Sequence, residues 1–138
     1  MIHLTLTTPD GILFEGDVDY FLAPSEKGPL QINGGYTPIF EILKDSGVLK
    51  IVMGNKVKYF AVFHSSLRVE PMKAVLCSQL AEDGYDIDKA RANDSLNRAR
   101  TRLEEQREGV DIARAKASME RALIRLEAKS LSEGRSIS

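Results

Sequence analysis

Large aromatic side chains and alanines occupy different parts of this 138-residue chain, and that division constrains the fold more than any motif. All nine aromatic residues lie at or before Tyr85, whereas nine of the twelve alanines lie at or after Ala81. Aromatic and β-branched residues suit pleated strands, and alanine is the strongest helix former. The division predicts a β-rich part and then a helical part. The boundary is expected near residues 80–86, where Asp83-Gly84 interrupts the pattern.

The first part has the pattern of short strands separated by turns. Apolar and polar residues alternate over residues 2–7 and again over residues 17–22. A third run ends before Gly54-Asn55, which is typical of a hairpin turn. Many short strands with turns between them indicate a sandwich or a flattened barrel, and we expect this domain to cover residues 1–85.

The second part, residues 86–138, has apolar residues at helical spacing and predicts an antiparallel hairpin of two helices, over residues 87–106 and 111–131. Gly109 suits the end of the first helix, and Asp111 suits the cap of the second. Four of the ten stripe positions are alanine, which buries little area, so we expect a weak interface between the helices and a hairpin that can open. The two stripes are Tyr85, Ala92, Leu96, Ala99 and Leu103, and Ile112, Ala115, Met119, Ala122 and Leu126.

Composition and isolated residues exclude several functions. A net charge of -1 argues against a cationic nucleic-acid binder, and the apolar runs are too short to predict a membrane span. The two histidines, His3 and His64, lack metal-ligand spacing, so no metal site is expected. Cys77 lies in an apolar run, which predicts a buried, inert thiol. Asp17 and Asp19 are expected on the solvent face of one strand.

Charged residues on the helices allow two interpretations. Arg121 and Arg125 are one turn apart, so their guanidinium groups can converge on one anion such as a phosphate. The alternative is a solvated face with local ion pairs to Glu120 and Glu127. The charge pattern alone does not separate the two. The first helix has a stripe of Asp88, Arg91, Ser95, Arg98 and Arg102, and the second has one of Arg114, Ser118, Arg121 and Arg125.

Several motifs resemble one family, the epsilon subunits of bacterial F-type ATP synthases. The start of the first helix, Ile87-Asp88-Lys89-Ala90-Arg91-Ala92, resembles the family's Ile/Leu-Asp-x-x-Arg-Ala segment. The opening Leu6-Thr7-Thr8-Pro9-Asp10-Gly11 is similar to its first strand and Thr-Pro-x-Gly turn. Residues 28–39 resemble its glycine- and proline-rich loop, and residues 122–126 resemble the end of its second helix. The order and spacing of these motifs cover nearly the whole chain.

The resemblance implies a non-catalytic subunit of the rotor, at the cytoplasmic face of the bacterial membrane and without a span of its own. Residues 1–85 are expected to bind the gamma subunit and the ring of c subunits, and so to couple ion-driven rotation to ATP synthesis. The helices of residues 86–138 are expected to extend toward the alpha and beta catalytic subunits and to inhibit ATP hydrolysis. The alternative is a stand-alone protein-binding module whose helical hairpin recognises a partner.

The resemblance also implies three groups of site residues, with no required cofactor and ATP as a regulatory ligand. The ATP-binding positions are Glu82, Ile87, Asp88, Arg91, Ala92, Arg121 and Arg125. The inhibitory contacts are Arg98, Arg102, Arg114, Arg121 and Arg125. The loop that faces the c-ring contains Gly28, Leu30, Ile32, Gly35, Tyr36 and Pro38. No catalytic residue and no metal ligand is expected.

Overall fold

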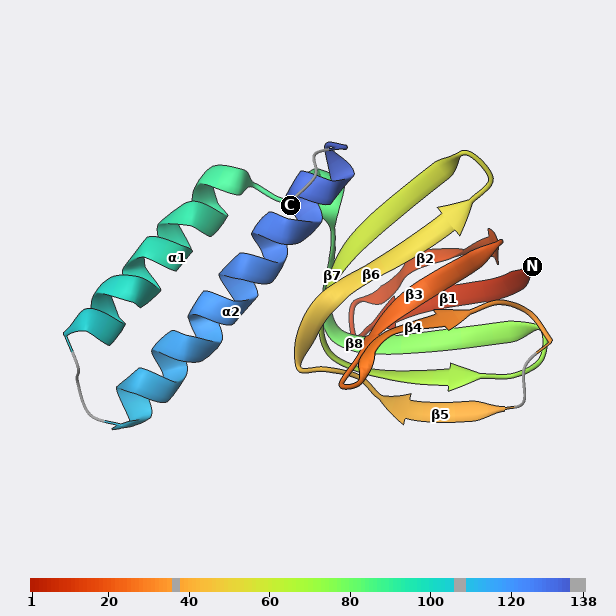
Figure 1. The fold of residues 1–138 in the computed structure, drawn as a ribbon, viewed down its shortest axis with the longest axis horizontal. Helices are drawn as coiled ribbons and strands as arrows, with labels where there is room; N and C mark the ends of the chain where they lie inside the picture. Colours follow the sequence, from red (N-terminus) through yellow and green to blue (C-terminus); the bar gives the residue numbers. More distant parts are fainter. Residues whose placement is uncertain (36–37, 106–108, 135–138) are drawn as a thin grey trace.

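The computed structural model describes residues 1–35, 38–105 and 109–134, and it contains a β-sandwich followed by a helical hairpin (Figure 1). The predicted fold class is confirmed. The strands are β1 (Ile2–Thr8), β2 (Gly11–Val18), β3 (Tyr20–Ser25), β4 (Gly28–Ile32), β5 (Ile39–Ile42), β6 (Ser46–Met53), β7 (Lys56–Val69) and β8 (Lys73–Asp83). The helices are the short 3-10 helix η1 (Gly84–Asp86), α1 (Lys89–Glu104) and α2 (Gly109–Ser132).

The described strands form one sheet in the order β2-β1-β8-β7-β6-β3-β4, with β5 paired to β7. Most neighbours are antiparallel, but the first and last strands, β1 and β8, pair in parallel. The sheet folds over a core of alternating inward side chains, among them Leu4, Phe21, Ile51 and Leu67. The predicted hairpin turn at Gly54-Asn55 joins β6 to β7, and Gly54 takes the left-handed φ of 58° that glycine permits.

Strand β7 is buried on both faces where the helices cover it. Phe60 and Val62 point into the sandwich core, whereas Ala61 and Phe63 form a second apolar cluster with Ala128 of α2. Figure 1 shows α2 against the sheet and α1 on its outer side. The sandwich therefore supports α2 directly, and α1 packs on α2.

The hairpin agrees with the predicted stripes, but its ends differ. Ala92, Leu96 and Ala99 are buried on α1, and Ala115 and Ala122 on α2. Tyr85, placed on the first stripe by the sequence, is instead exposed in η1, because the chain turns between β8 and α1 before helical spacing begins.

The predicted junction between the helices is also wrong. The first helix ends at Glu104, and α2 already begins at Gly109. Gly109 is therefore not the terminator of α1, and Asp111 lies within the first turn of α2 instead of capping it. Asp88 caps the start of α1, where its Oδ1 accepts a hydrogen bond from the Arg91 backbone N–H at 3.2 Å.

Two strand predictions are wrong. Residues 17–22 do not form one strand, because the chain breaks at Asp19, whose carboxylate accepts from the Gly54 N–H at 2.6 Å. Asp17 and Asp19 therefore do not share a strand face. Cys77 is exposed, not buried. It pairs with Ser66 and Thr7 on the outward side of the sheet, because its inward-pointing neighbour Leu76 sets the alternation.

Candidate functional site

A cleft of about 490 Å³ lies where the end of the sheet meets the start of the helical hairpin. Strand β8 and helix η1 form its base, the first turns of α1 form one wall, and Arg125 reaches in from α2. Because the helices are antiparallel, the second half of α2 returns past the start of α1. The lining residues are Leu13, Glu82, Asp83, Asp86, Ile87, Asp88, Arg91, Ala92, Ser95 and Arg125.

The structure brings six of the seven predicted ATP-binding residues to this one cleft. Glu82, Ile87, Asp88, Arg91, Ala92 and Arg125 line it. Arg121 is not among the described lining residues; one turn before Arg125 on α2, it donates from Nη2 to Ser118 Oγ at 3.3 Å. The helical repeat predicted from the sequence therefore places these side chains together, with Arg125 and not Arg121 as the cation that α2 contributes.

Arg125 holds the two domains together at the cleft. Its Nε donates to Glu82 Oε1 at 2.7 Å, and both side chains are partly buried. The guanidinium carbon also lies 5.1 Å from the centre of the Phe63 ring, a cation–π geometry. One turn later, Lys129 Nζ donates to the Tyr85 carbonyl at 2.7 Å. These contacts tie α2 to β7, β8 and η1.

The lining of the cleft carries more acidic than basic groups. Four carboxylates, from Glu82, Asp83, Asp86 and Asp88, face two arginines, so two negative charges are in excess. The charge of Asp83 is balanced by a residue outside the cleft, because Lys58 Nζ lies 3.0 Å from Asp83 Oδ2. With the hairpin docked, the cleft is therefore acidic and not cationic.

Sequence reasoning missed four residues of the cleft. Asp83 and Asp86 lie on either side of Gly84, where the last strand leads into the helical hairpin. That position is the only feature of the sequence that could have marked them as residues of the cleft. Ser95 follows Arg91 by one helical turn. Its place on the charged stripe of the first helix was predicted, but no function was assigned to it. Leu13 comes from β2, more than sixty residues earlier in the chain, and only the tertiary fold brings it here.

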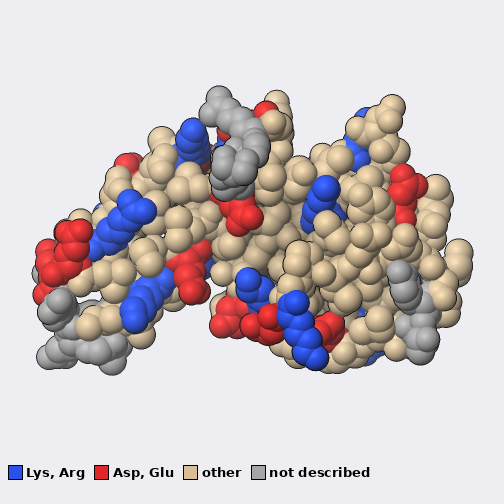
Figure 2. All heavy atoms as spheres, in the orientation of Figure 1, with Lys and Arg blue, Asp and Glu red and all other residues tan. Residues whose placement is uncertain are grey.

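The arginines predicted to make inhibitory contacts are spread along the hairpin. Arg98, Arg102 and Arg114 are exposed, and Arg121 and Arg125 are half-buried. Arg98 Nη2 donates to Ser95 Oγ of its own helix at 3.3 Å. Figure 2 shows basic and acidic side chains intermingled on the hairpin, so its surface has both signs of charge.

The residues predicted to face the c-ring do not form a single surface. Gly28 has a φ of 109° at the turn between β3 and β4, and Pro38 is exposed. Leu30 is half-buried on β4, and Ile32 is buried in the sandwich core, so Ile32 supports the loop and is not part of its surface. Gly35 is exposed with a φ of 85°. Tyr36 lies outside the described residues.

The outward side of the strands β5-β7-β8-β1-β2 is a second candidate surface, which we call the outer face. Register places residues of all five strands in one row, with exposed apolar side chains at its two ends. The row is Ile42, Ser66, Cys77, Thr7 and Ile12. The next row adds Phe40, which is also largely exposed. Such apolar groups on an open sheet face are typical of a protein contact.

Within residues 1–35, 38–105 and 109–134, no group of three or more His, Cys, Asp or Glu side chains is placed to hold a metal ion. None of the helices in those ranges has the length and apolar character needed to cross a membrane.

Family models match both parts of the chain. Residues 1–84 match the β-sandwich domain of the ATP synthase delta/epsilon chain, and residues 86–130 match the long α-helix domain of the same chain. The protein therefore belongs to the ATP synthase delta/epsilon chain family.

Individual relatives agree with this assignment. The chain is 34% identical over 103 residues to the ATP synthase epsilon chain of Anoxybacillus flavithermus, covering 75% of this chain and 76% of that one. It is 32% identical over 107 residues to the epsilon chain of Priestia megaterium, covering 78% and 79%.

Solved structures share the fold. The similarity to a chain of the Euglena gracilis mitochondrial ATP synthase has a TM-score of 0.70 at 20% identity, covering 96% of this chain and 79% of that one. A chain of the Tetrahymena thermophila mitochondrial ATP synthase central stalk and c-ring gives 0.58 at 16% identity, covering 93% and 96%.

Proposed function

We propose that the protein is a non-catalytic rotor subunit of the central stalk of an F-type ATP synthase, at the cytoplasmic face of the bacterial membrane. It couples ion-driven rotation to ATP synthesis and inhibits ATP hydrolysis through its C-terminal helices. The observation that carries the proposal is the match of both family models, in order, to a chain about one third identical to epsilon chains. The sandwich then serves as the anchor in the complex, and the hairpin serves as the regulator.

The outer face is the surface that we assign to the gamma subunit. Ile12, Phe40 and Ile42 are 60%, 63% and 65% exposed, and burying them against a partner releases water from apolar surface. The hairpin covers a different part of the molecule, the side formed by β6, β7 and η1. Gamma can therefore bind the sandwich whether the hairpin is docked or open. The loop that contains Gly35 and Pro38 is assigned to the c-ring, whereas Gly28 lies at the other end of β4, beside α2.

Inhibition is assigned to the opened hairpin. Arg98, Arg102 and Arg114 are already exposed, and undocking α2 would free Arg125 from Glu82. Exposed ion pairs contribute only about 0–1 kcal/mol each, so inhibition of the alpha and beta subunits requires several arginines together. The same reasoning makes inhibition weaker at high salt, because exposed charges are screened.

Reconstitution with alpha, beta and gamma subunits tests this role. We expect the full-length chain to lower the rate of ATP hydrolysis and a chain of residues 1–85 to bind gamma without lowering it. Replacing Arg98, Arg102, Arg114, Arg121 and Arg125 together with alanine should have the effect of the truncation. Co-purification with gamma and a cooperative thermal transition show that each variant is folded and assembled. Unchanged inhibition by the five-fold variant would remove these arginines from the mechanism.

The cleft is the proposed site for ATP as a regulatory ligand. Arg91 and Arg125 can donate hydrogen bonds from their guanidinium groups to phosphate oxygens. The Asp88 carboxylate can accept a hydrogen bond from the ribose or the base, and Ile87 and Ala92 provide an apolar wall. The acidic excess in the lining favours nucleotide bound with Mg²⁺ over the free tetra-anion, because the metal offsets phosphate charge. A ligand that bridges α1 and α2 stabilises the docked hairpin by mass action and so opposes inhibition.

Isothermal titration of the isolated chain with Mg-ATP tests the cleft. We expect binding that weakens at least tenfold in Arg91→Ala, since a hydrogen bond to a charged group contributes about 1.5–3 kcal/mol. Arg100→Ala is the matched control, because Arg100 is exposed on the same helix and does not line the cleft. Equal affinity of the two variants, or no binding at millimolar nucleotide, would contradict the assignment.

A further inference from the structure

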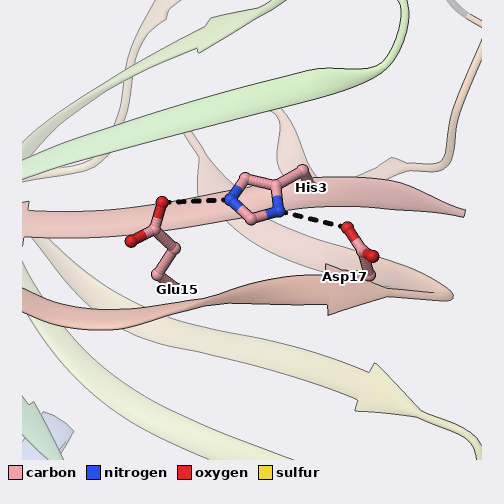
Figure 3. A network of polar contacts seen from close by, with 3 residues as sticks. All are labelled: His3, Glu15 and Asp17. Atoms are coloured by element: carbon pink, nitrogen blue, oxygen red, sulfur yellow. Dashed lines mark hydrogen bonds and ion pairs between the residues drawn. The ribbon is translucent and has the colours of Figure 1, made fainter.

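A three-residue polar cluster joins the first two strands at the sheet edge, far along the chain from the cleft. His3 lies on β1, and Glu15 and Asp17 lie on the edge strand β2 (Figure 3). The His3 ring lies between the two carboxylates: Nδ1 is 3.1 Å from Asp17 Oδ1, and Nε2 is 3.1 Å from Glu15 Oε2. Asp17 is the cross-strand partner of His3, and Glu15 is its diagonal neighbour.

This geometry is complete for only one protonation state of the ring. Ionised carboxylates only accept hydrogen bonds, and a neutral imidazole has a single N–H to donate. A neutral ring therefore leaves one of the two contacts without a proton, whereas an imidazolium donates to both. The other charged groups beside the ring come from β8 and its turn. Lys73 is the β8 register partner of His3, and its Nζ is paired with Glu70 at 3.2 Å.

We propose that protonated His3 clasps Glu15 and Asp17, and that loss of the proton loosens edge strand β2 and leaves uncompensated negative charge on the outer face. Strand β2 pairs only with β1 among the described strands, so a single hydrogen-bond ladder attaches it to the sheet. The clasp adds side-chain contacts across that ladder. Hydrogen bonds to Glu15, then to Asp17, raise the pKa of His3 above the ordinary value of 6.5. The clasp is therefore fully present below pH 6.5 and is lost as pH rises through the raised pKa.

The clasp also makes docking on the outer face dependent on pH, a consequence that rests on the proposed function. His3, Glu15 and Asp17 stand on the same side of the sheet as Ile12 and Phe40. A partner that covers this face removes water from the cluster. Two carboxylates without a counter-charge are more costly to desolvate than a clasped trio. Gamma should therefore bind more tightly when His3 is protonated.

The clasp is tested first in the isolated full-length chain. In a His64→Gln background, His3 is the only histidine, and its ring protons report its titration by NMR. We expect a pKa above 6.5 that falls in the variant carrying both Glu15→Gln and Asp17→Asn. We also expect amide protection in β2, relative to that in His3→Gln, to be about two- to fivefold higher near pH 6 than near pH 8. An unraised pKa, or a protection ratio that does not change with pH, would overturn the clasp.

Gamma affinity at the same two pH values tests the consequence for docking. The wild-type chain should bind about two- to fivefold more tightly near pH 6 than near pH 8, and His3→Gln should lose this difference. His64→Gln is the matched control and should retain it, since His64 lies outside the cluster. If neither the wild-type chain nor His3→Gln binds gamma while the NMR results hold, the proposed function fails and the clasp stands. If the wild-type chain and His3→Gln both bind gamma with the same pH profile, the link between clasp and docking is overturned.

Discussion

Replacing Phe60 with alanine should lower the free energy of unfolding by about 3–5 kcal/mol, the range for large-to-small changes in a packed core. Phe60 is 1% exposed on β7. Its ring meets Phe14 of β2 edge to face, with the centroids 6.1 Å apart, so the substitution empties the space between distant strands. Denaturant unfolding followed by circular dichroism measures the change.

Phe40→Ala is the matched control for this prediction. Phe40 is the same residue type in the same domain, but it is 63% exposed on β5. Its substitution should change the unfolding free energy by no more than about 0.5 kcal/mol. Similar losses for the two variants would contradict the position of the core between the layers of the sheet.

Gly84→Ala should detach α2 from the sheet while the sandwich stays folded. A Cβ atom at position 84 would stand 2.5 Å from the Ala128 carbonyl oxygen and 2.9 Å from its carbon, and backbone atoms cannot give way as a flexible side chain can. Overpacking of this kind costs about 1–3 kcal/mol. The contact of α2 with the sheet should yield first, because its apolar cluster around Phe63 and Ala128 is much smaller than the sandwich core. Hydrogen exchange, read separately for α2 and for the strands, distinguishes local release from global unfolding.

Gly16→Ala is the control for a glycine that does not contact the hairpin. The nearest atom to a Cβ at position 16 is Phe14 Cζ at 3.8 Å, an ordinary van der Waals separation. Exchange in α2 should match the wild type in this variant. Faster exchange in the strands of Gly84→Ala, to the same extent as in α2, would mean that the hairpin and the sandwich unfold as one unit.

The fold class could be predicted from the sequence because it follows from periodicity and composition, which are local properties. Ala92, Leu96 and Ala99 lie where the helical spacing puts them. The predictions that were wrong concern the ends of strands and the direction in which single side chains point. The break at Asp19 is fixed by a hydrogen bond to Gly54, a residue of another turn, and no pattern within residues 17–22 records it. Cys77 was misplaced because an apolar run does not say which of its residues face inward.

The candidate site was predictable in membership but not in electrostatics. Glu82, Asp88 and Arg91 are close in the chain, and the antiparallel return of α2 brings Arg125 to them. Neither the acidic excess nor the bond of Arg125 to Glu82 follows from spacing, because both depend on how α2 rotates onto the sheet. Leu13 required the whole tertiary fold. The His3 cluster likewise depends on the register of β1 with β2.

The parallel pairing of β1 with β8 determines how a mechanical load reaches the sandwich. The linker to the hairpin leaves from the end of β8, and β8 is bonded on one side to β7 and on the other to β1. Next to the linker β8 pairs with β7, and β1 adds a second ladder further back, along Lys73–Cys77. A pull along β8 loads these ladders in shear, so many hydrogen bonds share the force. An edge strand in that position would have only one ladder to carry the same load. Tension on the linker should undock α2 well before it disturbs the sheet that carries it.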